Sequence, residues 1–517
     1  MKILVTGGAG FIGSHLIDKL ISQGHEVVCL DNFFSGRKEN IQQHFTNSKF
    51  SLIKQDISLP LKVKFNKLDR IYNLACPGSP VQYQFDPIKT LNTSVLGIQN
   101  MLELAHKTGA RILQASTSEI YGDPLEHPQK ESYWGNVDPL GERACYDEGK
   151  RTAETLCKDY HKMYGIEVRL VRIFNTYGPR MMFNDGRVVS NFLLQALLGE
   201  DITVHGDGSQ TRSFCYIDDL IKALTGWMEK ETDFKPINIG NPDERSIVDL
   251  AKMIKEKTSS KSQIVFMPYE KVSGRTGDVR QRQADISKIK KELGWQPKIN
   301  FESGLEKTIV DFKKRLNNKP HIIIFSPSYL PFKGQAEEAV SEIIKRSQGW
   351  EFDLITSRMS KDLPKEEHQG NLHIYRLGRG TDRDKYWLPF KAFWLARRLH
   401  KKYKHQVAWA IMVSYGALAA LLFSKSAVKV PFLLSVYEAD VTEKMVKHGV
   451  LTSPVYRLIF KQAHRWQVIG KMSEKHRLWL EKERNVQAIK FDKNWDLMAK
   501  KTKELFQELE ILSTRVN

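Results

Sequence analysis

The sequence predicts an α/β protein with two units, each built on a parallel sheet. Strand-like apolar runs alternate with helix-like segments from the first residue onward, and this alternation begins again near residue 321. Such alternation is typical of a doubly wound parallel sheet, because crossover helices join neighbouring strands. A chain of 517 residues is also long enough for two or three buried cores. We therefore expect more than one domain.

Positive charge is concentrated in the last two fifths of the chain. Residues 320–517 hold 34 Lys+Arg against 21 Asp+Glu, a surplus of 13 within a net charge of +19. Such a surplus of positive charge would suit binding to an acidic membrane surface, to anionic small molecules or to nucleic acid. It could equally reflect a generically basic surface with no such partner. We do not expect nucleic acid as the partner.

The cysteines match neither a metal site nor a disulfide framework, so we expect reduced thiols and no metal. They are Cys29, Cys76, Cys145, Cys157 and Cys215. The chain opens directly on the apolar strand Lys2–Val5 rather than on a charged leader and cleavage site. This start predicts a cytoplasmic protein.

A glycine-rich turn follows the first strand, Lys2–Thr6. It has the spacing G-x-x-G-x-x-G and opens a helix, so backbone N–H groups can approach a pyrophosphate. About twenty residues on, the next strand ends in Asp31, whose carboxylate would bind both ribose hydroxyls and repel a 2′-phosphate. NAD is therefore the expected cofactor. The contacts expected here are Gly7, Gly10, Phe11, Ile12, Gly13, Asp31, Asn32, Phe33, Ser35 and Gly36.

Further strands are expected at 50–53, 70–75 and 111–116, with a helix at 95–107. Residues that end parallel strands meet at one edge of the sheet, where an open α/β fold binds its ligand. The residues that follow the third strand usually contact the adenine edge. The fourth strand ends at the edge of the sheet where the cofactor lies across it. This predicts further cofactor contacts at Asp56, Ile57, Leu74 and Thr93.

A phenol and an ammonium lie four residues apart, at Tyr146 and Lys150, at the start of a probable helix. They share one helix face, and a nearby cation favours the phenolate and lowers its pKa. Tyr146 is therefore a candidate base for an alcohol that is being oxidised. The fifth strand brings Thr117 and Glu119 to the same sheet edge, although either side chain could instead cap a turn or face solvent.

By these motifs, residues 1–315 resemble an extended short-chain dehydrogenase/reductase, and within that group the UDP-glucuronate decarboxylase (UDP-xylose synthase) family. The likeness rests on long matches: 31–40, 75–80, 117–124 with 127–129, 142–151, 172–181 and 185–192. It implies an NAD-binding Rossmann domain with a small substrate-binding subdomain, and a homodimer.

The resemblance also implies a reaction. Tyr146, assisted by Lys150 and Thr117, would take the C4 hydroxyl proton of UDP-glucuronate while NAD accepts the hydride. The 4-ketone would release carbon dioxide from C5, with Glu119 handling protons, and re-reduction at C4 would give UDP-xylose with NAD regenerated. The positions that match the family's contacts to the nucleotide and its phosphates are Asn175, Arg187, Arg212 and Arg282.

Two departures leave an alternative open. His205 stands where the family usually has an aromatic residue, and Gly78 where it has Ala. The loop 274–285 is longer than the decarboxylase loop and is more similar to that of sugar-nucleotide 4-epimerases. The alternative activity is therefore 4-epimerisation of UDP-glucuronate or another UDP-sugar.

The polar segment 311–320 reads as a linker to the second unit. There we expect strands at 321–325, 350–355 and 372–377 and a helix at 335–347. The uncharged run 407–423 is shorter than the roughly twenty residues of a membrane span, and Ser414–Gly416 divides it into a strand and a helix. Upstream, 391–404 predicts a basic amphipathic helix suited to an anionic bilayer surface.

Residues 320–517 resemble the amino-terminal, acceptor-side half of a GT-B glycosyltransferase of family 4. The likeness rests on the Ser326–Pro331 turn with Gly334, on 414–422 and on 435–440. A donor-binding domain is missing, so we predict no glycosyl transfer by this half alone. It would be an inert remnant, or a module that docks a membrane, a lipid-linked acceptor or a separate glycosyltransferase. Docking would place the protein at the inner face of the membrane.

Overall fold

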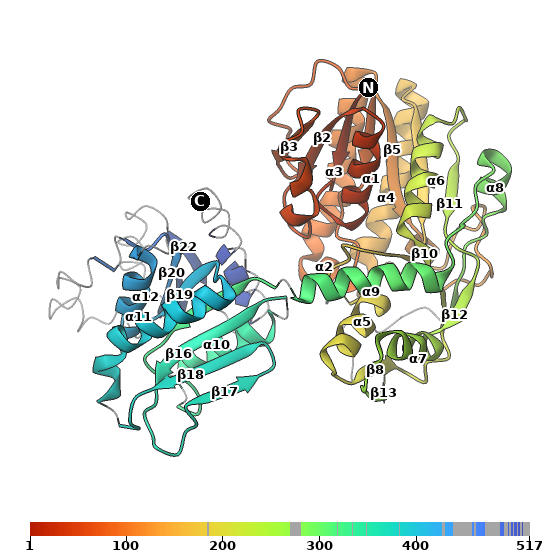
Figure 1. Ribbon diagram of the computed structural model, residues 1–517. Coiled ribbons are helices and arrows are strands. Elements are labelled where there is room, and N and C mark those ends of the chain that lie inside the picture. Colours follow the sequence, from red (N-terminus) through yellow and green to blue (C-terminus); the bar gives the residue numbers. More distant parts are fainter. Residues whose placement is uncertain are drawn as a thin grey trace. The chain divides into compact units, whose positions relative to one another are not determined.

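The computed structural model in Figure 1 divides into two units, Met1–Arg315 and Leu316–Asn517. It describes residues 1–183, 186–268, 281–317 and 319–437 except 333, 348, 382 and 427–429. Beyond these it describes 458, 459, 462–470, 486–490 and scattered positions between 495 and 509.

Unit 1 is built on a seven-stranded parallel sheet of order β11-β6-β5-β4-β1-β2-β3. The chain order reverses between β1 and β4, which creates a crevice at the carboxyl ends of these strands. The strands are β1 (Lys2–Thr6), β2 (Glu26–Asp31), β3 (Phe50–Lys54), β4 (Arg70–Asn73), β5 (Arg111–Thr117), β6 (Val168–Ile173) and β11 (Pro236–Ile239). The predicted doubly wound sheet is confirmed in this unit.

Helices cover both faces of this sheet. One core cluster packs α1 and α6 against Val5 and Val171, and another packs α3 and α4 against Leu4 and Ile112. The alternation of buried residues along each strand onto two faces is what a sheet sandwiched between helices requires. The covering helices are α1 (Phe11–Ser22), α3 (Pro87–Thr108), α4 (Ala144–Tyr164) and α6 (Ile217–Glu229).

Smaller elements gather at one end of unit 1, beyond the carboxyl edge of the sheet (Figure 1). They form two- and three-stranded pairings, β10-β7, β13-β8 and β12-β9-β14. Their bounds are α2 (Pro80–Phe85), β7 (Thr176–Tyr177), α5 (Val188–Leu198), β8 (Ile202–His205), β9 (Thr211–Ser213), β10 (Cys215–Tyr216), β12 (Glu244–Ser246), α7 (Ile247–Thr258), β13 (Ile264–Met267) and β14 (Gln281–Arg282). Helix α8 (Ser287–Leu293) instead lies beside β11 (Figure 1).

Helix α9 (Phe301–Asn317) corrects the predicted linker. Residues 311–317 belong to this helix and not to an irregular connection. Leu305, Ile309 and Phe312 recur at helical spacing and are buried against the core, which holds the last turns in place. Lys313 and Lys314, which follow Phe312, are exposed, so a polar composition was mistaken for a linker.

Unit 2 contains a second, mostly parallel sheet of order β17-β18-β16-β15-β19-β20-β21-β22. The antiparallel edge strand β17 was not foreseen. The elements are β15 (His321–Phe325), α10 (Gln335–Lys345), β16 (Glu351–Ser357), β17 (Glu366–Gln369), β18 (Leu372–Leu377), α11 (Asp384–Tyr403), β19 (Val407–Ile411), α12 (Tyr415–Lys425), β20 (Phe432–Tyr437), β21 (Arg465–Gly470) and β22 (Val486–Lys490).

The uncharged run 407–423 forms β19 and α12, as predicted. No described helix combines the length and apolar character needed to cross a membrane. Asp353 of β16 connects β15 with the residues just before β19. Its Oδ2 lies 2.8 Å from Nε2 of His405 and 3.3 Å from Nδ1 of His321. The second parallel α/β unit is confirmed. Residues 438–440, part of the likeness to a glycosyltransferase, lie outside the described residues.

Candidate active site

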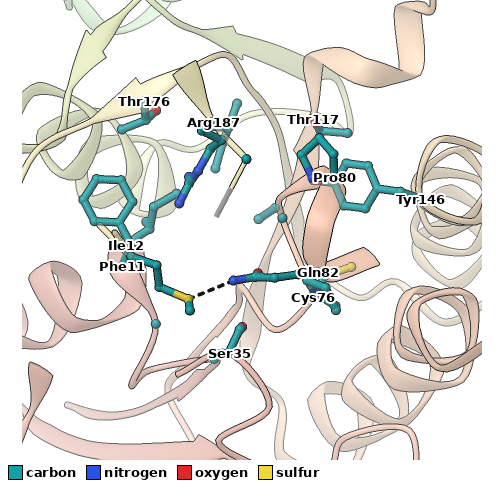
Figure 2. A pocket seen from close by; sticks show the side chains of 18 of the residues that line it. Phe11, Ile12, Ser35, Cys76, Pro80, Gln82, Thr117, Tyr146, Thr176 and Arg187 are labelled. Atoms are coloured by element: carbon teal, nitrogen blue, oxygen red, sulfur yellow. Dashed lines mark hydrogen bonds between the residues drawn. The ribbon is translucent and has the colours of Figure 1, made fainter. Parts of the chain in front are cut away.

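A deep pocket opens at the carboxyl edge of the seven-stranded sheet. Figure 2 shows Tyr146 and Thr117 on one side of it and Phe11, Ile12 and Arg187 on the other. Every candidate residue named from the sequence lines this pocket except Phe33, whose place in the wall is taken by Phe34. The elements supplying the wall are the amino end of α1, the ends of β2, β4 and β5, the first turns of α4, and β9 and β14.

The glycine loop permits a close approach at the amino end of α1. Gly7 adopts φ +66°, a left-handed conformation that favours glycine. A Cβ on Gly13 would lie 2.2 Å from the carbonyl oxygen of Gly7 and 2.7 Å from the Cα of Gly8. Helix α1 has no side-chain N-cap. Its first N–H groups therefore face the pocket without a capping side chain, which suits a pyrophosphate.

We expect Gly13→Ala to destabilise unit 1 by about 1–3 kcal/mol, because the added methyl meets backbone atoms that cannot move aside cheaply. Thermal unfolding and calorimetric titration with NAD would measure both the loss of stability and the weaker binding. Gly78→Ala is the matched control, because a Cβ there meets nothing within 4 Å among the described residues. Equal effects of the two substitutions would contradict this account of the loop.

Asp31 ends β2 with its carboxylate held by backbone donors. Its Oδ2 accepts from the N–H of Ala9 at 2.9 Å and its Oδ1 from the N–H of Phe33 at 2.7 Å. Each oxygen keeps a further acceptor position, so the carboxylate fits a ribose diol. A Cβ on Gly36 would lie 2.8 Å from both oxygens, which explains the glycine there. Burial raises the pKa of Asp31.

Asp56 is held by three neighbours, of which the sequence singled out only Asn32. It forms an ion pair with Lys89, accepts from Nδ2 of Asn32 at 2.9 Å and accepts from the Ser58 hydroxyl at 2.8 Å. Burial acts to raise the pKa of Asp56, but these hydrogen bonds outweigh it and bring the pKa to about 2. Asp56 is therefore ionised at neutral pH and can accept from a ligand amine.

Tyr146 lies in the first turn of α4, buried and hydrogen-bonded to the Thr117 hydroxyl. Its ring stacks on Tyr83 of α2, with centroids 4.9 Å apart and planes 7° apart. Lys150 donates from Nζ to the carbonyl of Ala115 at 2.9 Å, and its Nζ lies 5.8 Å from the centroid of the Tyr146 ring.

The prediction that the pKa of Tyr146 is lowered is wrong for this state of the protein. Burial is the largest influence and raises the pKa of Tyr146 above its ordinary value, and the charge of Glu119 acts in the same direction. The hydrogen bond from Thr117 acts in the opposite direction but is weaker. Tyr146 is therefore a neutral phenol here, poised in geometry but not ionised.

Glu119 forms two ion pairs with arginine side chains that line the pocket. The partners are Arg143, at the start of α4, and Arg282 of β14, whose Nη1 lies 3.3 Å from Oε1. Burial acts to raise the pKa of Glu119, but the two guanidinium groups outweigh it and bring the pKa to about 2. Glu119 is therefore a carboxylate, and these pairs stabilise the fold above pH 4.5, a contribution lost as the pH falls toward 2.

Three arginines of the predicted set also line the pocket. Arg212 of β9 and Arg282 of β14 are register partners on adjacent parallel strands, and both are buried. Arg187 lies over the ring of Phe11, 5.6 Å from its centroid. Asn175 and His205 also line the wall. Several cations converging on one pocket with a helix amino terminus can bind a diphosphate and a carboxylate.

The comparisons with known proteins assign unit 1. Residues 4–308 match the family model described as GDP-mannose 4,6 dehydratase. UDP-glucuronic acid decarboxylase 1 of Arabidopsis thaliana is 53% identical over 319 residues, which is 62% of this chain and 71% of that protein. UDP-glucuronic acid decarboxylase 3 of the same plant is 54% identical over 318 residues, 61% of this chain and 90% of that protein. The chain belongs to the UDP-glucuronic acid decarboxylase family. The match to the family model ends at residue 308, before unit 2 begins.

Solved structures with the same fold include relatives of this decarboxylase family that act differently. The UDP-glucuronic acid 4-epimerase of Bacillus cereus, solved with UDP-glucuronic acid and NAD, is 30% identical with a TM-score of 0.54. It covers 61% of this chain and 99% of its own. Residues 274–280 of the loop that resembled the epimerases lie outside the described residues. The next two residues of that loop, Gln281 and Arg282, form β14.

Three residues that matter here were missed by the sequence-based reading of this decarboxylase-family chain. Arg143 pairs with Glu119, Tyr83 stacks on Tyr146, and Asp147 is hydrogen-bonded to Glu119. Arg143 and Asp147 flank Tyr146 within the matched motif 142–151, so proximity in sequence was the available signal. Tyr83 carried no comparable signal, because α2 reaches Tyr146 only through the fold.

Proposed function

We propose that unit 1 converts UDP-glucuronate into UDP-xylose and carbon dioxide, using a resident NAD. The observation that carries this proposal is that Tyr146, Thr117 and Glu119 share one buried pocket wall in a chain 53% identical to named decarboxylases. An epimerase also oxidises C4 of a UDP-sugar, but the epimerases among the similar structures are only about 30% identical. The decarboxylase assignment is therefore preferred.

The cofactor side of the pocket fits NAD. The amino end of α1 faces the pyrophosphate position, and Asp31 offers acceptors to a ribose diol while its charge disfavours a 2′-phosphate. Bound NAD supplies reversible hydride acceptance at the nicotinamide. Asn32, Ser35, Asp56, Ile57, Leu74 and Thr93 complete the proposed contacts along the wall.

Oxidation at C4 needs a group that removes the hydroxyl proton. Tyr146 is the proposed acceptor, with Thr117 hydrogen-bonded to its phenol and Lys150 below the ring. Because burial holds the phenol neutral, Tyr146 must first release its own proton to solvent before it can accept the proton of the C4 hydroxyl, and Lys150 stabilises the resulting anion. The ring itself is fixed by stacking on Tyr83.

Loss of carbon dioxide follows from the ketone that this oxidation makes. A ketone at C4 turns the C5 carboxylate into a β-keto acid, and the electrons of the breaking C5–C6 bond pass into an enolate. C5 must then gain a proton before C4 is reduced again. The balance is UDP-glucuronate plus one proton giving UDP-xylose and carbon dioxide. Glu119, with Arg143 and Arg282, is the group proposed to manage protons and charge at C5.

The proposed substrate contacts line the same pocket as Tyr146. Arg187 and Arg212 are assigned to the diphosphate, and Asn175 and Arg282 to the remaining polar groups of the nucleotide sugar. Guanidinium groups bind phosphate and carboxylate oxygens in pairs, which suits a ligand carrying three anionic groups. His205 lies where it can pack on a base.

UDP-glucuronate deuterated at C4 tests this cycle of oxidation and reduction. The proposal expects UDP-xylose that retains the deuterium at C4, because the same NAD accepts and returns it. Mass spectrometry of the nucleotide sugar measures both the loss of the carboxyl group and the label. A deuterated hexuronate instead of a pentose would replace this proposal with the 4-epimerase.

We also propose that unit 1 forms a homodimer. Ile88, Leu91 and Leu96 of α3 are exposed apolar side chains, with exposed fractions of 73%, 40% and 44%. A cluster of apolar residues on one helix surface is what a protein interface would cover. Light scattering during gel filtration measures the mass directly, and a monomeric mass at micromolar concentration would contradict the proposal.

For unit 2 the likeness to an acceptor-side glycosyltransferase half stays a prediction, and we propose the docking module rather than the inert remnant. Helix α11 exposes Trp387, Phe390 and Trp394, each more than 60% exposed, along one face. The same face continues into the cations Arg398 and Lys401 toward the end of the helix. Aromatic side chains followed by cations suit the interface of an anionic bilayer.

Reversing four charges, Arg397, Arg398, Lys401 and Lys402 to Glu, is expected to weaken vesicle binding by at least ~100-fold, because each cation near an anionic surface contributes about 1 kcal/mol. Flotation of the full chain with phosphatidylglycerol vesicles measures this. Lys361→Glu with Lys365→Glu is the matched control on the same unit, off the helix. If wild-type chain does not float, the remnant is the correct description.

A further inference from the structure

A second carboxyl group lies directly behind Glu119. Asp147 follows Tyr146 in the first turn of α4 and is 7% exposed. Its carboxyl group is hydrogen-bonded to that of Glu119. Glu119 lines the pocket, whereas Asp147 does not. The order from the pocket inward is therefore Glu119 first and Asp147 second.

Two carboxyl groups can share a hydrogen bond only when one of them carries a proton, because a carboxylate is an acceptor alone. Glu119 is paired with both Arg143 and Arg282, so its anionic form is the stabilised one. The shared proton consequently belongs to Asp147. The Oδ1 of Asp147 is buried without a hydrogen-bond partner among the described residues, which a neutral acid tolerates and a carboxylate does not.

The surroundings of Asp147 keep this proton in place at neutral pH. Burial first, and then the charge of Glu119, raises the pKa of Asp147 to about 8, while Arg143 and Arg282 act in the opposite direction. Asp147 is thus neutral below pH 8 and ionises above it. The titratable or charged groups that interact with Asp147 are Glu119, Arg143, Arg282, Cys145, Tyr146 and Tyr83.

We propose that Asp147 is the proton reserve for the step after carbon dioxide leaves, acting through Glu119. This proposal rests on the proposed decarboxylase function. Asp147 passes its proton to the Glu119 carboxylate, and Glu119 delivers that same proton to C5, so one C–H bond forms as the enolate returns to the ketone. Asp147 regains a proton from solvent, which supplies the one proton consumed per turnover, and no electrons are transferred. Asp147 is a positioning residue, because it reaches the substrate only through Glu119.

The test compares Asp147→Asn with Glu148→Gln, a matched control whose side chain pairs with Arg151 and lies outside the cluster. Asn keeps a hydrogen-bond donor but cannot supply a proton. Reactions in D2O report which of the two C5 hydrogens of UDP-xylose comes from solvent. We expect the product of wild type and of Glu148→Gln to carry one deuterium, always at the same C5 position. The product of Asp147→Asn should be a mixture of molecules with the one deuterium at either C5 position, and the turnover of Asp147→Asn should be reduced about 10- to 100-fold. Asp147→Glu is expected to restore single-position labelling.

Two further readouts separate this role from a structural one. Wild-type turnover should decline above pH 8 as Asp147 ionises, and this alkaline decline should be absent from Asp147→Asn. If Asp147→Asn does not fold, the wild-type chain still decides: C5 labelling should be confined to one position at pH 7 and spread over both at pH 9. Single-position labelling at both pH values would overturn the reserve.

Failure of the reserve and failure of the proposed function look different. Wild type that makes UDP-xylose, with Asp147→Asn showing the same labelling and the same alkaline decline, overturns the reserve alone. Wild type that returns a six-carbon uronate overturns both, because no enolate at C5 then needs a proton.

Discussion

Replacing Tyr146 with Phe is expected to lower kcat for UDP-glucuronate by about 10²- to 10⁴-fold while leaving NAD bound. The phenol is the group within hydrogen-bonding reach of Thr117 at the carboxyl edge of β5, and Phe removes only that oxygen. Stacking on Tyr83 holds the ring in place, so the pocket should keep its shape. Steady-state kinetics, with NAD content measured after denaturation, give both numbers.

Tyr83→Phe is the matched control for that substitution. Both phenols are buried and their rings are stacked, but the Tyr83 hydroxyl has no hydrogen-bond partner among the described residues and does not line the pocket. Its removal should therefore change kcat little. Equal losses in the two variants would show that the stacked pair matters for packing, and would remove Tyr146 from its role as the proton acceptor.

The second large effect is expected at Glu119. Glu119→Gln removes the carboxylate charge that pairs with Arg143 and Arg282, and breaking such an ion pair costs about 3–5 kcal/mol of stability in comparable sites. It also removes the carboxylate that faces C5, so turnover by the folded variant should fall by about 10²- to 10⁴-fold. Chemical denaturation and kinetics on the folded fraction measure the two losses separately.

Glu154→Gln separates stability from chemistry in this comparison. Glu154 is paired with Arg172 at 2.8 Å and accepts from the Ser116 hydroxyl, but it does not line the pocket. A similar loss of stability with nearly normal turnover per folded molecule is expected. Turnover of Glu119→Gln that matches that of Glu154→Gln would contradict a chemical role for Glu119.

Local patterns were sufficient for much of the site. The strand–glycine–helix spacing predicted where α1 and Asp31 lie, and the motifs after β5 and at the start of α4 brought Thr117, Glu119 and Tyr146 to one edge. Parallel strands make this possible, because their carboxyl ends converge whatever the intervening sequence. These expectations needed only the order of elements.

Features that depend on three-dimensional surroundings were not predicted. The pKa of Tyr146 is raised chiefly because the phenol is buried, and burial cannot be predicted from a four-residue spacing. The shared proton between Asp147 and Glu119 arises from the packing of α4 against the end of β5. The end of α9 was mistaken for a linker because its lysines hid Ile309 and Phe312.

The fate of the substrate's carboxyl carbon tests the central claim most directly. The full chain would be incubated with UDP-glucuronate labelled with ¹³C at C6, and the carbon followed by NMR. The account predicts that the label leaves as carbon dioxide and bicarbonate in step with substrate loss, while a pentose spectrum appears. Label that stays in a six-carbon uronate with an altered H4 coupling would contradict it and identify the chain as a 4-epimerase.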